Sequence, residues 1–145
     1  MQAAYEVACN LRPEDYREVV EGHGHDPKLT LPIGAKQTDS VYFTSPTGVI
    51  AGVAGVGTEG EIWMLCTPAI STFPITFARE AKRYIESRQE DLLWNIADKR
   101  NTTHLKLLKF LGFKFLRELI HGPNNLTFIE FYRVRTCSPR SIECR

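Results

Sequence analysis

Imidazole and carboxylate side chains gather in one short segment near the N-terminus. His23 and His25 are separated by a single glycine, with Glu21 before them and Asp26 after them. These side-chain types are ligands for zinc and similar metals. The Gly-His-Gly-His sequence, however, has neither the helical nor the strand spacing that would hold ligands in place. We therefore interpret the segment as an exposed turn and predict no metal site.

Two further side chains could carry protons. Glu61 lies at the edge of the apolar segment 62–67, and His104 lies near the start of an apolar helical pattern. For Glu61, the position favours a solvated carboxylate at the end of a strand over a general base. For His104, we favour a partly buried imidazole that is hydrogen-bonded to a neighbouring strand over a ligand or a proton carrier.

Two hydroxyl side chains, Ser71 and Thr72, follow the apolar segment 62–67 and precede a helical pattern with Pro74 in its first turn. Serine and threonine are common at the start of a helix, where the dipole attracts anions. The two hydroxyls could therefore bind an anion. Pro68 and Pro74 lack N–H groups, which leaves fewer backbone donors at this place.

The cysteines indicate a reducing compartment. Cys9 and Cys66 lie in apolar runs, where we expect buried free thiols, and Cys137 and Cys144 lie in a polar C-terminal segment. No two of them form a C-x-x-C pair, so the spacing does not indicate a zinc ribbon. Synthesis in a cytoplasm fits best, although a bridge between Cys137 and Cys144 in an oxidising place stays open.

The charge balance argues against broad contact with nucleic acid or with an anionic membrane. Lys and Arg number 18 and Asp and Glu number 17, which gives a net charge of +1. We expect no membrane span and no signal peptide, because the N-terminal residues are charged and no apolar run is long enough. A basic run surrounds the last predicted helix and is interpreted as a solvated face: Lys99, Arg100, Lys106, Lys109 and Lys114.

The elements that must position these residues follow from the hydrophobic pattern. We predict one domain over residues 1–134 and a polar tail over 135–145. Helices are expected from Pro13, around 28–35, after Thr72 and from Asn101 to Leu111. The alternation of helices and strands predicts an α/β fold with a mixed central sheet of six to seven strands, flanking helices and a C-terminal β-hairpin. The predicted strands are 3–9, 40–44, 49–56, 62–67, 92–97, 113–119 and 126–134.

This order, with the helix that opens at Asn101 and closes in the Leu111-Gly112-Phe113 turn, resembles the acyl-CoA N-acyltransferase (GNAT) fold. The resemblance implies that acetyl-CoA, if bound, would lie at the end of the strand 62–67. Its binding residues would be Cys66, Thr67, Ser71, Thr72 and Asn101.

Two features of GNAT enzymes are missing from this sequence. Such enzymes carry a Gln/Arg-x-x-Gly-x-Gly/Ala run after this strand, because glycine lets the backbone approach a phosphate closely. Residues 67–74 read Thr-Pro-Ala-Ile-Ser-Thr-Phe-Pro instead, and Leu108 stands where the enzymes often place a catalytic tyrosine. The resemblance therefore implies that catalysis is lost and that no cofactor is bound.

A closer resemblance is to the small internal virion protein (internal virion protein A) family of short-tailed bacteriophages, itself similar to a diverged GNAT domain. The segments that carry it are Leu93-Trp94-Asn95, Asn101–Leu105, Phe110–Gly112 and Phe128–Phe131. It implies a virion or assembly protein, made in the host cytoplasm, that binds other phage proteins. An active N-acetyltransferase acting on a host or phage protein is the first alternative. A module that binds nucleic acid or a portal through the basic run is the second.

Overall fold

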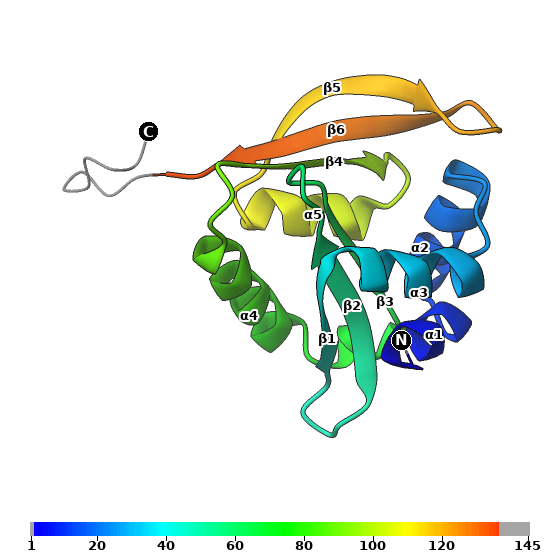
Figure 1. The fold of residues 1–145 in the computed structure, drawn as a ribbon, viewed down its shortest axis with the longest axis vertical. Helices are drawn as coiled ribbons and strands as arrows, with labels where there is room; N and C mark the ends of the chain where they lie inside the picture. The colour runs from blue at the N-terminus through cyan, green and yellow to red at the C-terminus, as the bar shows by residue number, and fades with distance from the viewer. Residues whose placement is uncertain (1, 137–145) are drawn as a thin grey trace.

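In the computed structural model, which describes residues 2–136, six strands form two three-stranded antiparallel sheets (Figure 1). The first sheet has the order β1 (Asp39–Thr44), β2 (Ile50–Val56), β3 (Ile62–Cys66). The second has the order β4 (Leu92–Asp98), β6 (Leu126–Val134), β5 (Lys114–His121). The predicted α/β class and the C-terminal hairpin of β5 and β6 are confirmed.

The expected mixed sheet is divided in two. A mixed sheet requires parallel pairing, but within residues 2–136 such pairing is limited to one bridge between Glu61 and Trp94, which joins β3 to β4. The reason is that β6 lies between β4 and β5 and pairs with both in antiparallel register. The strands on either side of the last helix therefore run the same way without being neighbours.

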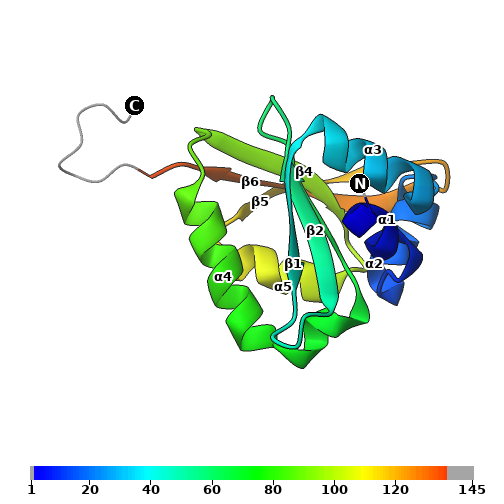
Figure 2. The ribbon, with the colours of Figure 1, turned by 60° about the horizontal axis from the view of Figure 1, so that its bottom comes forward.

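Helices cover both faces of the first sheet (Figures 1 and 2). On one face lie α1 (Gln2–Cys9), α2 (Pro13–Arg17), the π-helical turn η1 (Glu18–Gly22) and α3 (Pro27–Gln37). On the other lie the 3-10 turn η2 (Pro68–Thr72), α4 (Pro74–Ser87) and α5 (Thr102–Phe110). Coverage on both faces explains why β2 and β3 are apolar almost throughout. No helix among residues 2–136 has the length and apolarity that crossing a membrane requires.

The prediction of a strand over residues 3–9 is wrong, because this segment is the helix α1. Ala4, Val7 and Ala8 are buried, and their spacing is that of one helical face. This face packs on α3 and β2. Cys9, expected to be buried, is exposed at the end of the helix, whereas Cys66 is buried as predicted. Cys137, Cys144 and most of the predicted tail lie outside the described residues.

The helix α5 begins after Asn101 and ends before Gly112, and these two residues differ from what a regular helix would show. Gly112 has a φ of +92°, the left-handed conformation predicted for the residue that ends the helix. Asn101 lies at the N-cap, where asparagine often caps a helix, but its side chain makes no capping hydrogen bond. Its side chain instead forms hydrogen bonds with Arg12 and Asp15, at the start of α2. The core beside α5 contains Val56, Ile85, Leu93, Leu108 and Phe131.

Candidate functional site

The strands β3 and β4 touch at their N-terminal ends and separate beyond that point. The backbone N–H of Trp94 donates to the Gly60 carbonyl over 3.1 Å, and its indole Nε1 donates to the Glu59 carbonyl over 3.0 Å. The Asn95 Nδ2 donates to the Ile62 carbonyl over 2.8 Å. Past these bonds no ladder joins the two strands within residues 2–136. The result is a wedge-shaped gap that widens toward Cys66 and Asp98.

Two carboxylates from α2 and η1 close the wide end of this gap. Asp15 Oδ2 accepts the backbone N–H of Cys66 over 2.8 Å, and Glu18 Oε1 accepts the backbone N–H of Asp98 over 2.8 Å. The Arg12 N–H also donates to the Cys66 carbonyl over 2.9 Å. The exposed backbone groups at the ends of both strands are therefore satisfied by the protein itself.

Asn101 belongs to the same network. Its Nδ2 donates to Asp15 Oδ1 over 2.9 Å, and its Oδ1 accepts from Arg12 Nη2 over 2.8 Å. Arg12 Nε donates to Asp15 Oδ2 over 3.0 Å. Asp15 and Asn101 are only 1% and 2% exposed. These groups therefore form a buried polar network with no free donor or acceptor visible at Asn101, one of the residues expected to hold acetyl-CoA.

Glu18 is the most perturbed acid in this region. Burial disfavours its ionised form and, with the nearby carboxylates of Asp15 and Asp98, raises its pKa to about 8. For Asp98, burial works in the same direction, but hydrogen bonds from Arg100 outweigh it and hold its pKa below the ordinary value. Glu18 is therefore mostly protonated at neutral pH, beside an ionised Asp98.

Met64 presents backbone groups to the middle of the gap. The backbone N–H and C=O groups of successive β3 residues point alternately toward β2 and toward β4. Those of Met64 and Cys66 point toward β4. Cys66 is bonded to Asp15, and the carbonyl of Ile62 is bonded to Asn95. Among the described residues, no hydrogen bond is seen for the Met64 N–H across the gap. This N–H is the donor that a bound group would meet there.

The hydroxyl groups of the segment after β3 form hydrogen bonds with backbone carbonyls, most of them in the same segment. Ser71 Oγ donates to the Pro68 carbonyl and Thr72 Oγ1 to the Ala69 carbonyl, each over 2.7 Å. Thr67 is buried, donates to the Ile50 carbonyl over 2.9 Å and accepts the Ala69 N–H over 3.3 Å. Ser71 and Thr72 are exposed. The five expected binding residues thus lie near one end of β3, but the structure does not turn their polar groups toward a common point.

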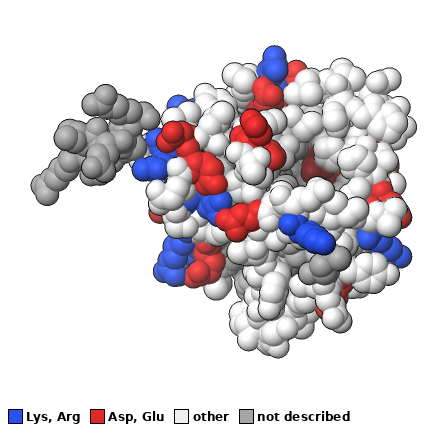
Figure 3. All heavy atoms as spheres, in the orientation of Figure 1, with Lys and Arg blue, Asp and Glu red and all other residues white. Residues whose placement is uncertain are grey.

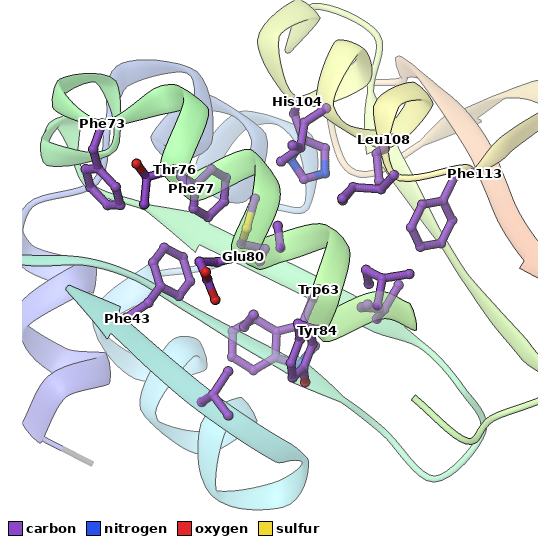
Figure 4. A pocket seen from close by; sticks show the side chains of 18 of the residues that line it. Phe43, Trp63, Phe73, Thr76, Phe77, Glu80, Tyr84, His104, Leu108 and Phe113 are labelled. Atoms are coloured by element: carbon purple, nitrogen blue, oxygen red, sulfur yellow. The ribbon is translucent and has the colours of Figure 1, made fainter. Parts of the chain in front are cut away.

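Two cavities meet at the gap between β3 and β4. One of about 230 Å³ lies on the side of η1 and α3 and includes Glu18 and His23 in its wall. The other, of about 530 Å³, lies between the first sheet, α4 and α5 (Figure 4). Both are lined by Met64, His104 and Phe131. A small group could therefore reach the Met64 N–H from either side.

His104 is the side chain at which the two cavities meet. Burial lowers the pKa of the imidazole below its ordinary value. The ring packs edge-on to Phe131, with 6.5 Å between the ring centres. His104 is therefore neutral at physiological pH. The imidazole contacts Phe131 of β6, but the hydrogen bond to a neighbouring strand that was expected from the sequence is not found among the described residues. The place of His104 in both cavity walls was not foreseen.

The other candidate acids and bases lie away from the meeting point. Leu108, at the place of the expected tyrosine, is buried and lines only the larger cavity. The Glu61 carboxylate accepts the Glu59 N–H over 3.0 Å within a turn. That bond agrees with the structural role predicted for Glu61.

The histidine loop forms a contact between two elements. His23 Nδ1 and His121 Nε2 are 2.9 Å apart, so one nitrogen donates to the other. Burial, with the neighbouring His121 and His25, lowers the pKa of His23 to about 4. Within residues 2–136 no three His, Cys, Asp or Glu side chains are grouped as a metal site requires. The loop therefore joins the β5–β6 hairpin to η1.

The basic run does not form a uniform patch. Lys99 pairs with Glu118 over 2.7 Å, and Arg100 pairs with Asp98 and Glu21 over 2.8 and 2.9 Å. On the face shown in Figure 3, basic and acidic side chains are intermixed. Pairing of this kind weakens the field that nucleic-acid binding needs.

The residues that build this site were mostly missed from the sequence. Asp15 and Glu18 were not among the candidate site residues that the sequence indicated. Their partners, Cys66 and Asp98, are about 50 and 80 positions away, as the hydrogen bonds show. One available signal was the position of Asp15 and Glu18, three residues apart on one short helical segment, which places both on the same side.

Comparisons with known proteins find likeness in structure alone. A scan against models of protein families and a search of curated sequences give no match. A GNAT-family acetyltransferase from Bacillus anthracis has a TM-score of 0.61 at 11% identity, over 92% of this chain and 87% of that one. A putative GNAT-family acetyltransferase from Bordetella pertussis has a TM-score of 0.60 at 15% identity, over 92% and 88%.

A more distant structure is a spermidine N-acetyltransferase SpeG chimera from Vibrio cholerae and hSSAT. Its TM-score is 0.53 at 13% identity, over 82% of this chain and 75% of that one. At such identities the likeness establishes the architecture and not the activity. Residues 2–136 therefore adopt a GNAT-like fold in which residues 2–9 are helical and two buried carboxylates bond to the ends of β3 and β4.

Proposed function

We propose that this protein is a virion or virion-assembly protein of a short-tailed bacteriophage that uses a catalytically degenerate GNAT domain to bind other phage proteins. The observation that carries the loss of catalysis is the bond from the Cys66 N–H to Asp15. It fills the cofactor end of the gap with a group of the chain itself. The two prolines after β3 and the leucine at position 108 support the same conclusion.

The phage assignment is supported by the hydrogen bonds formed by the segments that resemble the small internal virion protein family. Trp94 and Asn95 bond to the Glu59 and Ile62 carbonyls, and Asn101 bonds to Asp15 and Arg12. These residues hold the two sheets together, so they would be retained by a family that keeps the shape and not the reaction. The phage proteins themselves would be the partners, bound in the host cytoplasm or in the particle.

Calorimetric titration with acetyl-CoA, followed by an assay for acetylation of amines and of phage and host extracts, tests the loss of catalysis. We expect no saturable heat and no turnover. Tight binding together with turnover would refute it. The phage assignment is tested separately, by immunodetection in purified particles and assembly intermediates of the phage that carries the gene. Absence from both would contradict that assignment.

The second candidate is an active acyl-CoA-dependent N-acyltransferase acting on a host or phage protein. It is favoured by the Met64 N–H, which faces the place where the two cavities meet. A thioester carbonyl entering from the larger cavity would accept this hydrogen bond, and an amine would approach from the smaller one. Glu18 lines the amine side. Its ionised fraction, which grows as the pH rises toward its pKa of about 8, would take the proton from the amine. Two results together would support this function. The wild type would bind acetyl-CoA saturably and acetylate an amine, and Glu18→Ala would lose the turnover while its affinity for acetyl-CoA stayed unchanged.

A further inference from the structure

Binding of other phage proteins does not explain the cavity between α4 and the first sheet, and the second candidate function uses only its end beside Met64. The cavity measures about 530 Å³, whereas protein interiors hold few voids larger than a water molecule. The apolar stripe of α4 faces the sheet, yet Ile85 is the one residue of this helix that is fully buried. The helix therefore stands away from the sheet over most of its length, and the apolar surface between them has no partner within the described residues.

The wall of this cavity changes from apolar to polar along its length. The interior is formed by small and aliphatic side chains of the sheet, α4 and α5, among them Ala54, Ala81 and Leu107. Except for Tyr84 and His104, the polar lining lies at one opening, between the end of β1 and the first half of α4. The side chains at this opening are Thr44, Ser45, Thr76 and Glu80.

Aromatic side chains stand beside the opening (Figure 4). Phe43 of β1 and Phe77 of α4 face each other with 5.3 Å between ring centres, and Phe73 packs edge-on to Phe77 at 6.3 Å. Trp63 lies further along the wall. An elongated apolar molecule entering here would pass between rings before it reached the aliphatic interior.

The lining decides between a hydrocarbon chain and a peptide. A peptide inside would bring N–H and C=O groups that lose free energy unless they are hydrogen-bonded. The interior wall offers few such partners, because the hydroxyls are gathered at the opening. A hydrocarbon chain has no such requirement. No lysine or arginine is among the described residues that line this cavity, and Glu80 at the opening is already paired with Arg83 over 2.7 Å. An anionic head group would therefore find no cation in the lining.

We propose that this cavity binds a single-chain amphiphile, with its hydrocarbon chain between α4 and the first sheet and an uncharged or cationic head group beside Thr76 and Glu80. A volume of about 530 Å³ lies within the range of ordinary ligand pockets, roughly 300–1,000 Å³. The inference goes beyond the proposed function, since it does not depend on whether acetyl-CoA binds or on which proteins are the partners.

Trp63 provides the readout. The chain has two tryptophans, and Trp94 is not part of this cavity wall. In a Trp94→Phe variant, the emission of Trp63 reports contact with a dodecanol that is brominated at its far end, because bromine quenches a neighbouring indole. We expect saturable quenching at one probe per protein, and binding several-fold weaker for the corresponding brominated dodecanoate. Equal affinity for the two probes would refute the head-group preference.

Filling the cavity locates the probe. Ala81→Phe should abolish the saturable quenching, while Arg79→Phe, an exposed position on the same helix outside the cavity wall, should leave it unchanged. If Ala81→Phe does not fold, Thr76→Phe at the exposed opening serves instead. Absence of saturable quenching, or quenching that survives in the folded filling variant, would overturn the proposal.

Discussion

Two parts of the gap between the sheets differ in whether the protein itself provides hydrogen-bond partners for the backbone groups of the strands. At the wide end, Asp15 and Glu18 accept hydrogen bonds from the backbone N–H groups of Cys66 and Asp98, and the half-buried Arg12 completes the network. On the α4 side, by contrast, an apolar cavity lies open beside an unengaged Met64 N–H. The comparison teaches that one fold can satisfy its polar backbone groups internally at one place and leave an unfilled apolar cavity at another.

The largest effect is expected from Asp15→Ala. This change leaves the Arg12 guanidinium without its buried partner and the Cys66 N–H without an acceptor. Breaking a buried ion pair in this way costs about 3–5 kcal/mol. Urea unfolding should show that loss, with Glu14→Ala as the matched control. Glu14 also pairs with Arg12 but is partly exposed, so its removal should cost about 1 kcal/mol or less. Equal losses would show that the closed end is not a specific network.

The pH dependence of stability separates Glu18 from its neighbours. Because its folded pKa of about 8 lies above the ordinary value of 4.5, the native state holds the proton more tightly than the unfolded state does. The contribution to stability is therefore complete below about pH 4.5 and is lost as the pH rises toward 8. Relative to Glu18→Gln, the wild type should lose about 2–4 kcal/mol between pH 5 and pH 8.

Urea unfolding of both proteins across this pH range measures that difference. His23, whose pKa is lowered, has the opposite dependence in part of the same range, since stability is lost as the pH falls below 6.5 toward 4. This effect is common to both proteins and cancels in the comparison. Parallel curves for wild type and Glu18→Gln would mean that the carboxyl is not buried as described.

Enlarging a side chain should change stability differently on the two sides of the first sheet. Ala81→Leu adds apolar volume in the open cavity, so we expect no loss of stability and a gain of up to about 1 kcal/mol. Ala4→Leu makes the same change in the closely packed contact of α1, where overpacking costs about 1–3 kcal/mol. Urea midpoints of the two variants test this directly. A similar loss for both would show that the space beneath α4 is already filled.

The smallest effects are expected from Ser71→Ala and Thr72→Ala. Their hydroxyls bond to carbonyls of the same exposed turn, so each change should alter stability by less than about 0.5 kcal/mol. Neither should change the response to acetyl-CoA in a calorimetric titration. Loss of a measurable heat in either variant would instead place the phosphates of the cofactor at this turn.

The sequence predicted the elements better than the contacts between them. The strands near residues 40–44, 92–97 and 126–134 and the left-handed Gly112 follow from local patterns, and all of them were found. Residues 3–9 were predicted to be a strand because a short run of small apolar residues fits both the helical and the strand periodicity. The correct period is set by packing on α3 and β2, which the local sequence does not contain.

The site was harder to predict for the same reason. The bonds of Asp15 and Glu18 join residues far apart in the chain, so their burial leaves no local pattern. The cavity was hidden because Phe73, Phe77 and Ala81 lie at the spacing of an ordinary core-facing stripe. Whether a stripe meets the sheet or stands away from it depends on the distance between elements. Hydrophobic periodicity carries no information about that distance.

The amide signals of Met64 and Cys66 in a nuclear magnetic resonance titration with acetyl-CoA test the central claim most directly. If the chain's own carboxylates close the cofactor end of the gap, the Cys66 amide stays hydrogen-bonded to Asp15 and protected from exchange. Neither signal should then move at millimolar acetyl-CoA. A saturable shift of both signals, with loss of protection at Cys66, would show that the cofactor displaces Asp15 and would contradict the account.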